Sequence, residues 1–176
     1  MKTLLLMRHA KSSWSQSDVD DHNRILNARG RAAADTMARW LINRDLVPDH
    51  AHVSSAARTC ETWTRMTAHL PGPITATYHR SLYLSGPDVM LDTLKGTPDT
   101  AQTVLLLAHQ PGMSAMTQLM SDGTATDHAA RAVSQFPTAA IATLSVQTNR
   151  WRALDFGIAR VTGFDVPRDQ AGVTTD

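Results

Sequence analysis

The sequence predicts an α/β fold, a three-layer α/β/α sandwich around a largely parallel sheet with an antiparallel hairpin at one edge. Two short, continuously apolar segments, residues 4–7 and 103–108, are typical of strands that are buried on both faces. Segments with helical periodicity separate them, and two alternating segments near the C-terminus predict the hairpin. We expect one domain over residues 1–164. Residues 165–176 have no core pattern and are expected to form a loose tail.

The first helix is predicted from its cap and its apolar spacing. The strand at 4–7 is followed by residues 12–26, which are polar and unperiodic and therefore predict a long loop. Asn27 is a favourable N-cap for a helix over residues 28–44. Pro48 prevents its continuation. The side chains placed on its apolar face are Ala33, Met37, Trp40 and Leu41.

The central part of the chain predicts a short strand over residues 52–54 and two helices. One helix spans about residues 57–70 and ends before the Pro71–Gly72–Pro73 segment. The second follows Gly86 and Pro87 over residues 88–96, with proline at a favoured first-turn position. The side chains of the first helix that we expect to face inward are Trp63, Met66 and Leu70.

The C-terminal part begins with the second apolar strand, at 103–108. A turn at Pro111–Gly112 precedes a helix with three methionines on one side, Met113, Met116 and Met120. Residues 139–146 and 151–156 alternate in polarity and are joined by the polar residues 147–150, which predicts the hairpin.

The composition excludes several classes of function. Seventeen basic residues against sixteen acidic ones leave a net charge of +1, so we expect no nucleic-acid partner and no membrane-surface binding. No apolar segment is long enough for a membrane span, and Arg8–His9 interrupts the N-terminal apolar run too early for a signal peptide. Cys60 is the single cysteine and cannot form an internal disulfide, which favours a cytoplasmic location.

Both apolar strands end in histidine. Residues 4–7 are followed by Arg8 and His9, and residues 103–108 are followed by His109. If the strands are parallel, both histidines lie at one edge of the sheet, where α/β folds bind ligands. Arg58 lies at another strand-to-helix junction. Each residue alone is more typical of an ordinary surface or hydrogen-bonded position, but together they indicate an electropositive pocket for an oxyanion such as phosphate.

The sequence motifs resemble those of the histidine phosphatase superfamily, which has the phosphoglycerate-mutase-like fold. Residues 8–12 (RHAKS) resemble its first histidine motif, residues 54–62 its second arginine motif, and residues 108–112 (AHQPG) its second histidine motif. The chain is most similar to the branch of small phosphohistidine phosphatases. Further segments that match this branch are residues 24–30, 81–84 and 136–138.

The resemblance implies a covalent phosphoryl-transfer mechanism. His9 is then the nucleophile and forms a phosphohistidine intermediate that water hydrolyses. Arg8, Arg58 and a protonated His109 hold the phosphoryl oxygens, and Ser12 adds a hydrogen bond. The resemblance implies that no metal and no cofactor are needed, because these cations take the place of a metal.

The chain departs from the family where many members carry a general acid. They place a glutamate at the position of Leu84 in the 82–85 segment, where this chain has no carboxylate. Asp88 follows nearby, but we expect it to interact with a helix dipole. Tyr83 and His79 are further candidates. An imidazole leaves more easily than an alkoxide, so the missing acid favours a phosphoramidate or an activated ester over an ordinary alcohol phosphate.

Three functions remain open at this stage. The leading hypothesis is a phosphatase whose partner is a protein carrying phosphohistidine. The alternatives are a phosphatase for a small phosphoester, such as a sugar or nucleotide phosphate, and a non-catalytic module that binds phosphoproteins. The intact set of two histidines and two arginines argues against the module, because binding alone does not need His9. The sequence does not determine the oligomeric state.

Other polar features have simpler interpretations. His50 and His52 would share one face of a strand, but no third metal ligand is evident, so we expect surface histidines. Asp18, Asp20 and Asp21 lack the spacing of a calcium loop, and we expect a solvated loop. For Trp14, a substrate surface and simple packing of the loop are equally compatible with the sequence.

Overall fold

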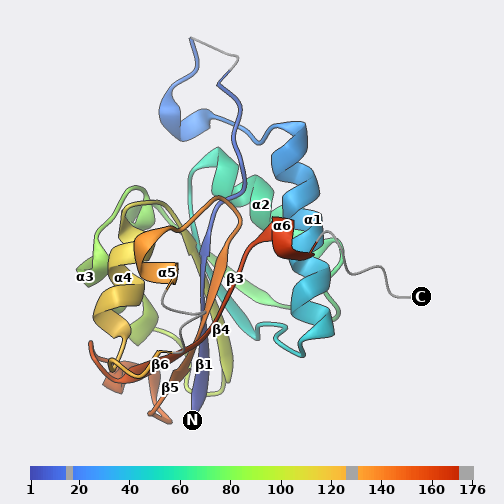
Figure 1. The fold of residues 1–176 in the computed structure, drawn as a ribbon. Coiled ribbons are helices and arrows are strands. Elements are labelled where there is room, and N and C mark those ends of the chain that lie inside the picture. The colour runs from blue at the N-terminus through green and yellow to red at the C-terminus, as the bar shows by residue number, and fades with distance from the viewer. Residues whose placement is uncertain (15–17, 126–130, 171–176) are drawn as a thin grey trace.

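The computed structural model describes residues 1–14, 18–125 and 131–170. Part of the predicted loop (15–17) and the end of the predicted tail (171–176) lie outside these residues. A six-stranded sheet forms the middle layer (Figure 1). Its strands are β1 (Lys2–Arg8), β2 (His50–Ser54), β3 (Thr75–His79), β4 (Thr103–Ala108), β5 (Ile141–Val146) and β6 (Ala159–Asp165).

The strand order is β3-β2-β4-β1-β5-β6. The first four strands in this order are parallel, β5 is antiparallel to β1, and β6 is antiparallel to β5. The predicted sheet, mostly parallel with an antiparallel edge, is therefore confirmed.

Helices cover both faces of the sheet (Figure 1). The helices α1 (Ala28–Asn43) and α2 (Ala57–Thr67) lie on one face. The other face carries α3 (Pro87–Lys95), α4 (Gly112–Met120) and α5 (Arg131–Ser134). Within the described ranges, no helix has the length and apolar character needed to cross a membrane.

Strand β1 connects the two halves of the core. Leu4 and Leu6 pack with the methionines of α3 and α4, whereas Leu5 and Met7 pack under α1 and α2. All four side chains are 0% exposed. Burial of each stabilises the fold by about 1.5–3 kcal/mol, so the residues at the end of β1 are held on a rigid base.

Helix α1 begins as the sequence predicts. The side chain of Asn27 accepts a hydrogen bond from the Gly30 amide at 2.8 Å, which confirms the cap. Ala34 is buried where we expected Ala33, which is only partly buried. A Cβ atom at Gly30 would overlap the backbone carbonyl of Lys11, so glycine allows α1 to pack closely against the segment after β1.

Two predictions in the middle of the chain need correction. The helix predicted to reach Leu70 ends at Thr67, although Leu70 is buried. Strand β3 was not predicted, because an edge strand with partly exposed residues and little apolar character has no clear alternation.

The position of the last strand was also predicted wrongly. Residues 151–153 form a short 3₁₀ helix, η3 (Trp151–Ala153), and the strand that pairs with β5 starts only at Ala159. Trp151 explains the difference. Its indole N–H donates to the Ala101 carbonyl at 2.9 Å, and its amide donates to Asp99 at 2.7 Å. These bonds hold the fully buried ring in the core beside the sheet, where it cannot be part of a hairpin.

The packed part of the chain continues beyond the predicted boundary at Phe164. Strand β6 includes Asp165, and Val166 is only 3% exposed. Helix α6 (Pro167–Gln170) then lies beside α1 (Figure 1). The loose tail that we predicted therefore does not begin at residue 165.

The histidines predicted at the surface are buried. His50 and His52 are 6% and 4% exposed. The Nδ1 atom of His52 lies 3.0 Å from Nε2 of His79, and its Nε2 atom lies 2.8 Å from the Thr97 hydroxyl. The described residues contain no group of three or more histidine, cysteine or acidic side chains arranged to hold a metal ion. Burial, followed by the neighbouring His50 and His79, lowers the pKa of His52 to about 3.

We predict that these histidines make folding stability pH-dependent. Because the pKa of His52 in the folded protein lies below the 6.5 of an unperturbed histidine, the unfolded chain binds more protons between these values. The contribution of His52 to the free energy of unfolding is then fully present above about pH 6.5 and is lost as the pH falls. For His52 alone, the free energy of unfolding should decrease by roughly 1–2 kcal/mol at pH 5. Urea unfolding at pH 7.5, 6.5, 5.5 and 5.0 measures the slope. A His52→Asn variant should show a shallower slope, and a pH-independent wild type would contradict the prediction.

Candidate active site

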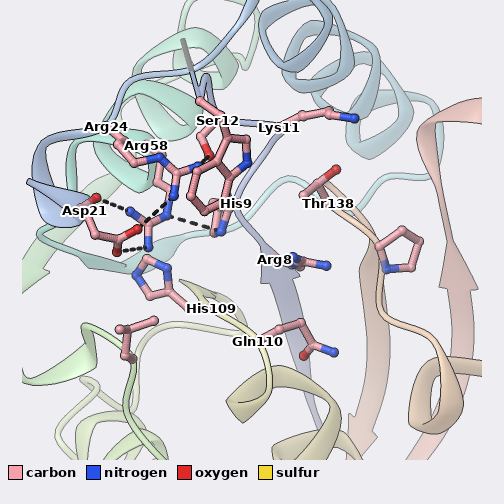
Figure 2. Close-up of a pocket in the computed structure, with 13 residues that line it drawn as sticks. Arg8, His9, Lys11, Ser12, Asp21, Arg24, Arg58, His109, Gln110 and Thr138 are labelled. Carbon is pink, nitrogen blue, oxygen red and sulfur yellow. Dashed lines mark hydrogen bonds and ion pairs between the residues drawn. The ribbon is translucent and has the colours of Figure 1, made fainter. Parts of the chain in front are cut away.

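A pocket of about 680 Å³ lies beyond the carboxyl ends of β1 and β4 (Figure 2). It is lined by all five residues that the sequence predicted for the site, Arg8, His9, Ser12, Arg58 and His109. The parallel pairing of β1 with β4 places Arg8 opposite Ala108, so the two histidines follow at the same level. Their ring centroids are 5.2 Å apart.

The ring of His9 is held in one tautomer. Its Nδ1 atom lies 2.8 Å from the Ala10 carbonyl, and since a carbonyl can only accept, Nδ1 carries the proton. The Nε2 atom therefore keeps its lone pair, toward which Arg58 Nε donates at 3.3 Å. Burial lowers the pKa of His9 to about 4, with further lowering by Arg58, Arg8 and Arg24. His9 is thus neutral near pH 7 and able to act as a nucleophile.

The backbone around His9 is tied to α2 through one hydroxyl group. The amide of Ala10 donates to the Thr62 hydroxyl at 3.0 Å, and this hydroxyl donates to the Arg58 carbonyl at 2.6 Å. Thr62 is fully buried. A single side chain therefore links the segment that carries His9 to the helix turn that carries Arg58.

Two buried polar atoms of the pocket residues have no partner among the described residues. They are Arg8 Nε and His109 Nδ1. Another nitrogen of Arg8, Nη1, donates to the Phe136 carbonyl at 2.8 Å, and His109 Nε2 lies 2.8 Å from the Ser54 hydroxyl. Buried polar atoms are rarely left unpaired, so these two are candidates for binding a ligand.

His109 differs from the expectation in its charge. The resemblance implied a protonated ring, but burial, followed by His9 and Arg58, lowers the pKa of His109 to about 3. The ring is therefore neutral near pH 7 in the unliganded protein. A bound dianion would favour its protonated form.

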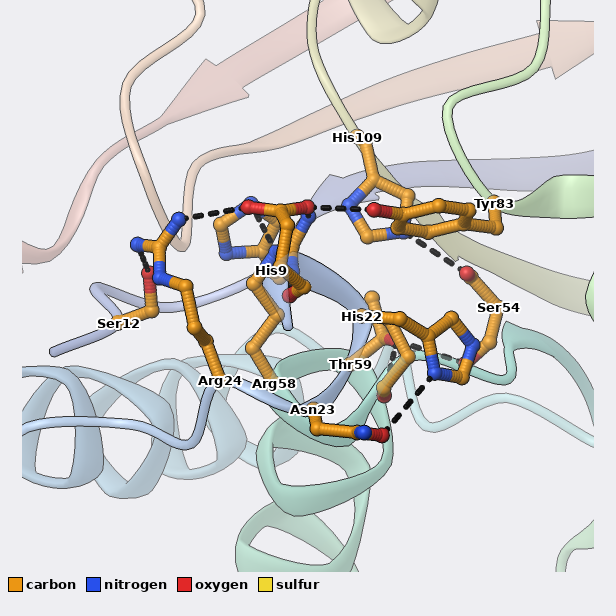
Figure 3. A network of polar contacts seen from close by, with 12 residues as sticks. His9, Ser12, His22, Asn23, Arg24, Ser54, Arg58, Thr59, Tyr83 and His109 are labelled. Carbon is orange, nitrogen blue, oxygen red and sulfur yellow. Dashed lines mark hydrogen bonds and ion pairs between the residues drawn. The ribbon is translucent and has the colours of Figure 1, made fainter. Parts of the chain in front are cut away.

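Asp21 is a residue of the pocket that the sequence interpretation missed. We expected it in a solvated loop, but it lies in the 3₁₀ helix η1 (Asp21–Asn23) and faces the cations (Figure 2). Figure 3 shows its three hydrogen-bond partners, Arg24, Arg58 and Tyr83. Its carboxylate accepts from Tyr83 at 2.5 Å, Arg24 at 2.8 Å and Arg58 at 3.1 Å. The Tyr83 hydrogen bond, followed by the two arginines, lowers the pKa of Asp21 to about 2, despite an opposing effect of burial.

Arg24 was also missed as a site residue. It donates to the Ser12 hydroxyl at 2.5 Å, and its guanidinium lies 3.4 Å from the centroid of the Trp14 ring. Trp14 itself is 79% exposed and lines the pocket, so the first loop presents an aromatic surface at the rim. Arg24 lies in the 24–30 segment that matched the family, which is the sequence signal that could have identified it.

The position that lacks a general acid lies at the mouth of the pocket. Leu84 lines it, is 56% exposed and has a positive φ of 50°, an unusual conformation for a bulky residue. Of the other candidates for the acid, Tyr83 lies at the site, where its hydroxyl donates to Asp21 at 2.5 Å, and the remaining two are placed elsewhere. Asp88 is exposed on α3, and His79 lies in the buried histidine cluster. Asp21 is the one carboxyl group among the described residues that line the pocket.

Comparison with known proteins identifies relatives along most of the chain. The model of the histidine phosphatase superfamily (branch 1) matches residues 4–80. An uncharacterized protein of Mycobacterium leprae is 35% identical over 166 residues, which cover 92% of this chain and all of that protein.

Solved structures show the same fold. The SixA protein of Nakamurella multipartitia is 26% identical, with a TM-score of 0.83 and coverage of 94% of this chain and 96% of that one. The SixA protein of Agrobacterium tumefaciens is 29% identical, with a TM-score of 0.78 and coverage of 94% and 98%. The protein histidine phosphatase SixA complexed with tungstate is 20% identical, with a TM-score of 0.77 and coverage of 95% and 98%.

We predict that Thr62→Val destabilises the protein by about 1–2 kcal/mol, because it leaves the buried Ala10 amide and Arg58 carbonyl without this partner at nearly constant volume. Thr64→Val is the matched control, since Thr64 is exposed on the same helix. It should change stability by less than about 0.5 kcal/mol. Urea unfolding at pH 7.5 compares them, and equal stabilities of the two variants would refute the role of Thr62.

Proposed function

This chain belongs to the histidine phosphatase superfamily, in its branch of small SixA-like proteins, and is a phosphatase; from its site we propose that it hydrolyses phosphohistidine in proteins through a phosphoryl intermediate on His9. The observation that carries the proposal is the state of the His9 ring. It is neutral, its Nδ1 proton is held by the Ala10 carbonyl, and its Nε2 lone pair lies beside Arg58.

In the first step, Nε2 of His9 attacks the phosphorus atom and the bond from phosphorus to the substrate nitrogen breaks. The electron pair of that bond stays on the departing imidazole, which takes a proton from solvent. His9 keeps its Nδ1 proton throughout, hydrogen-bonded to the Ala10 carbonyl. A fixed ring and a bound phosphoryl group remove much of the entropic cost of this step.

The cations of the pocket stabilise the transferring group. Arg58 and Arg8 lie on the two sides of His9 and can donate to the phosphoryl oxygens, in part through the unpaired Nε atom of Arg8. His109 gains a proton more readily once the dianion is bound. Charge stabilisation of this kind is the main contribution to catalysis of phosphoryl transfer.

In the second step, water attacks the phosphorus atom of the intermediate. The bond from phosphorus to Nε2 breaks and its electron pair returns to Nε2. Inorganic phosphate leaves with the oxygen and both hydrogens of the water. His9 is then again neutral, as the low pKa of the free ring requires.

The choice of phosphohistidine over an alkyl phosphate rests on the missing acid. Leu84 occupies the family's acid position, and Asp21, with a pKa of about 2, carries no proton to give at neutral pH. An alkoxide would therefore leave without help, whereas imidazole is a good leaving group once solvent protonates it.

Two observations support a protein substrate. The exposed side chains of Trp14 and Leu84 stand at the rim, where a polypeptide around the phosphorylated residue could contact them. Structures that share this fold include one described as a protein histidine phosphatase complexed with tungstate, a tetrahedral oxyanion like phosphate. We propose a cytoplasmic location, which the single cysteine favours.

The central test compares phosphate release from a phosphohistidine carrier protein and from p-nitrophenyl phosphate. We predict at least tenfold higher kcat/KM for the carrier protein. His9→Gln should lower activity by about 10³-fold or more, because no nucleophile remains. His69→Gln, which alters an exposed histidine that lies 3.2 Å from Asp35, serves as the matched control and should retain activity. A preference for the phenyl ester, or an active His9 variant, would refute the proposal.

Metal removal provides a second test. Since Arg8 and Arg58 supply the positive charge at the phosphoryl group, we predict that dialysis against EDTA changes kcat/KM by less than about twofold. The assay is then repeated with Mg²⁺ or Mn²⁺ added back. Activity that is lost with EDTA and restored by a metal would show that the proposed arginines are not sufficient.

A further inference from the structure

A second, smaller hollow of about 190 Å³ adjoins the candidate active site. The two share Lys11, Pro137 and Thr138 as lining residues. Figure 2 shows Lys11 and Thr138 on the side of His9 that lies away from Asp21. We call this hollow the Lys11 pocket; its other lining residues are Arg29, Ala33, Val166, Pro167 and Arg168.

The Lys11 pocket carries three cations, Lys11, Arg29 and Arg168, and none of its described lining residues is acidic. Within the described part of the chain, the side chains of Lys11 and Arg29 form no ion pair or hydrogen bond. Among the described residues, the one ion-pair partner of Arg168 is its neighbour Asp169, at 3.7 Å. The whole chain has a net charge of +1, so this is a local excess of positive charge and not a general property of the surface.

The position of Arg29 makes this excess more notable. It lies in the first turn of α1, where the helix dipole disfavours cations and where this helix has no acidic residue. Arg31, in the same turn, is compensated by Glu61 at 2.6 Å. Arg29 has no such partner in the ranges that the structure describes. A residue that opposes the local electrostatic preference is often retained for a ligand.

The phosphoryl group does not need these cations. Arg8 and Arg58 already lie beside His9, and Arg24 is paired with Asp21 at the far side. The cations of the Lys11 pocket are therefore in excess of what one phosphoryl group requires. Thr138 lines both pockets, so a ligand with its phosphoryl group at His9 could place a second group among these cations.

We propose that the Lys11 pocket is a second anion subsite, which binds a carboxylate carried by the phosphorylated substrate. In a phosphoprotein, this is an acidic side chain next to the phosphorylated residue. The inference rests on the proposed function for its first anion, the phosphoryl group at His9. Ala33, Val166 and Pro167 form an apolar wall of the pocket, and the exposed guanidinium groups of Arg29 and Arg168 can bind a carboxylate with paired hydrogen bonds.

Calorimetry with uncleavable ligands tests the subsite without any turnover. Alkylphosphonates are compared with phosphonocarboxylates of equal chain length, with two to six methylene groups, at low salt. At the best length, the carboxylate should improve affinity about tenfold. In the double variant Arg29→Gln, Arg168→Gln this ratio should fall close to one.

Arg39→Gln is the matched control for this measurement, because Arg39 is exposed farther along the same helix and lies outside the Lys11 pocket. It should keep the tenfold ratio. Thermal unfolding confirms that each variant is folded. Equal affinities for the two ligand series at every length, or a ratio unchanged in the double variant, would overturn the inference.

Phosphohistidine peptides show whether the carboxylate belongs to a protein. Two peptides differ only in carrying glutamate or glutamine next to the phosphohistidine, and the glutamate peptide should have about tenfold higher kcat/KM. The double variant should lose this preference. Equal rates for the two peptides would overturn the assignment to an acidic side chain, whatever the calorimetry shows. If the wild type cleaves neither peptide, the proposed function fails, while the calorimetric ratio still decides on the anion subsite.

Discussion

The parallel pairing of β1 with β4 is the constraint on which the site depends. Both strands are buried on both faces at the centre of the sheet, and their register places Arg8 beside Ala108. His9 and His109 therefore leave the sheet at the same level without any contribution from loops. A shift of one residue in this register would turn every core side chain of β1 to the opposite face, so the hydrophobic core itself protects the geometry of the two histidines.

The cations that this arrangement gathers repel one another, and Asp21 offsets that repulsion. Arg24 and Arg58 share its carboxylate, and the backbone carbonyl of Asp21 accepts a further hydrogen bond from Arg58 at 2.6 Å. Tyr83 donates to the same carboxylate oxygen as Arg58, Oδ2. Arg58, which we propose binds the phosphoryl group, is thus oriented before the ligand arrives, which is the preorganisation that electrostatic catalysis requires. The cost is a negative group that a bound phosphoryl group must tolerate nearby.

The parts of the fold that could be predicted from sequence are those that local patterns determine. The two apolar strands and the N-cap Asn27 are examples. Burial on both faces requires a continuous apolar segment, and an N-cap requires a particular residue type, so both are recognisable within a few residues. His9 and His109 could be placed together for the same reason. Asp21 could not, since its role depends on Arg58 and Tyr83, which lie 37 and 62 residues farther along the chain. The last strand was misplaced because alternation around Trp151 does not reveal that its indole bonds to the Ala101 carbonyl.

The low pKa of His9 has a consequence for the lifetime of the proposed intermediate. Burial and three arginines make its ring a weak base, with a pKa of about 4. A weakly basic nitrogen is a less powerful nucleophile, but it is also a better leaving group when water attacks the phosphorylated ring. The environment that slows phosphorylation of His9 therefore speeds hydrolysis of the phosphorylated ring. Phosphorylated enzyme should remain a minor species during turnover. The proposed reaction therefore releases phosphoryl groups as inorganic phosphate and does not retain them on His9.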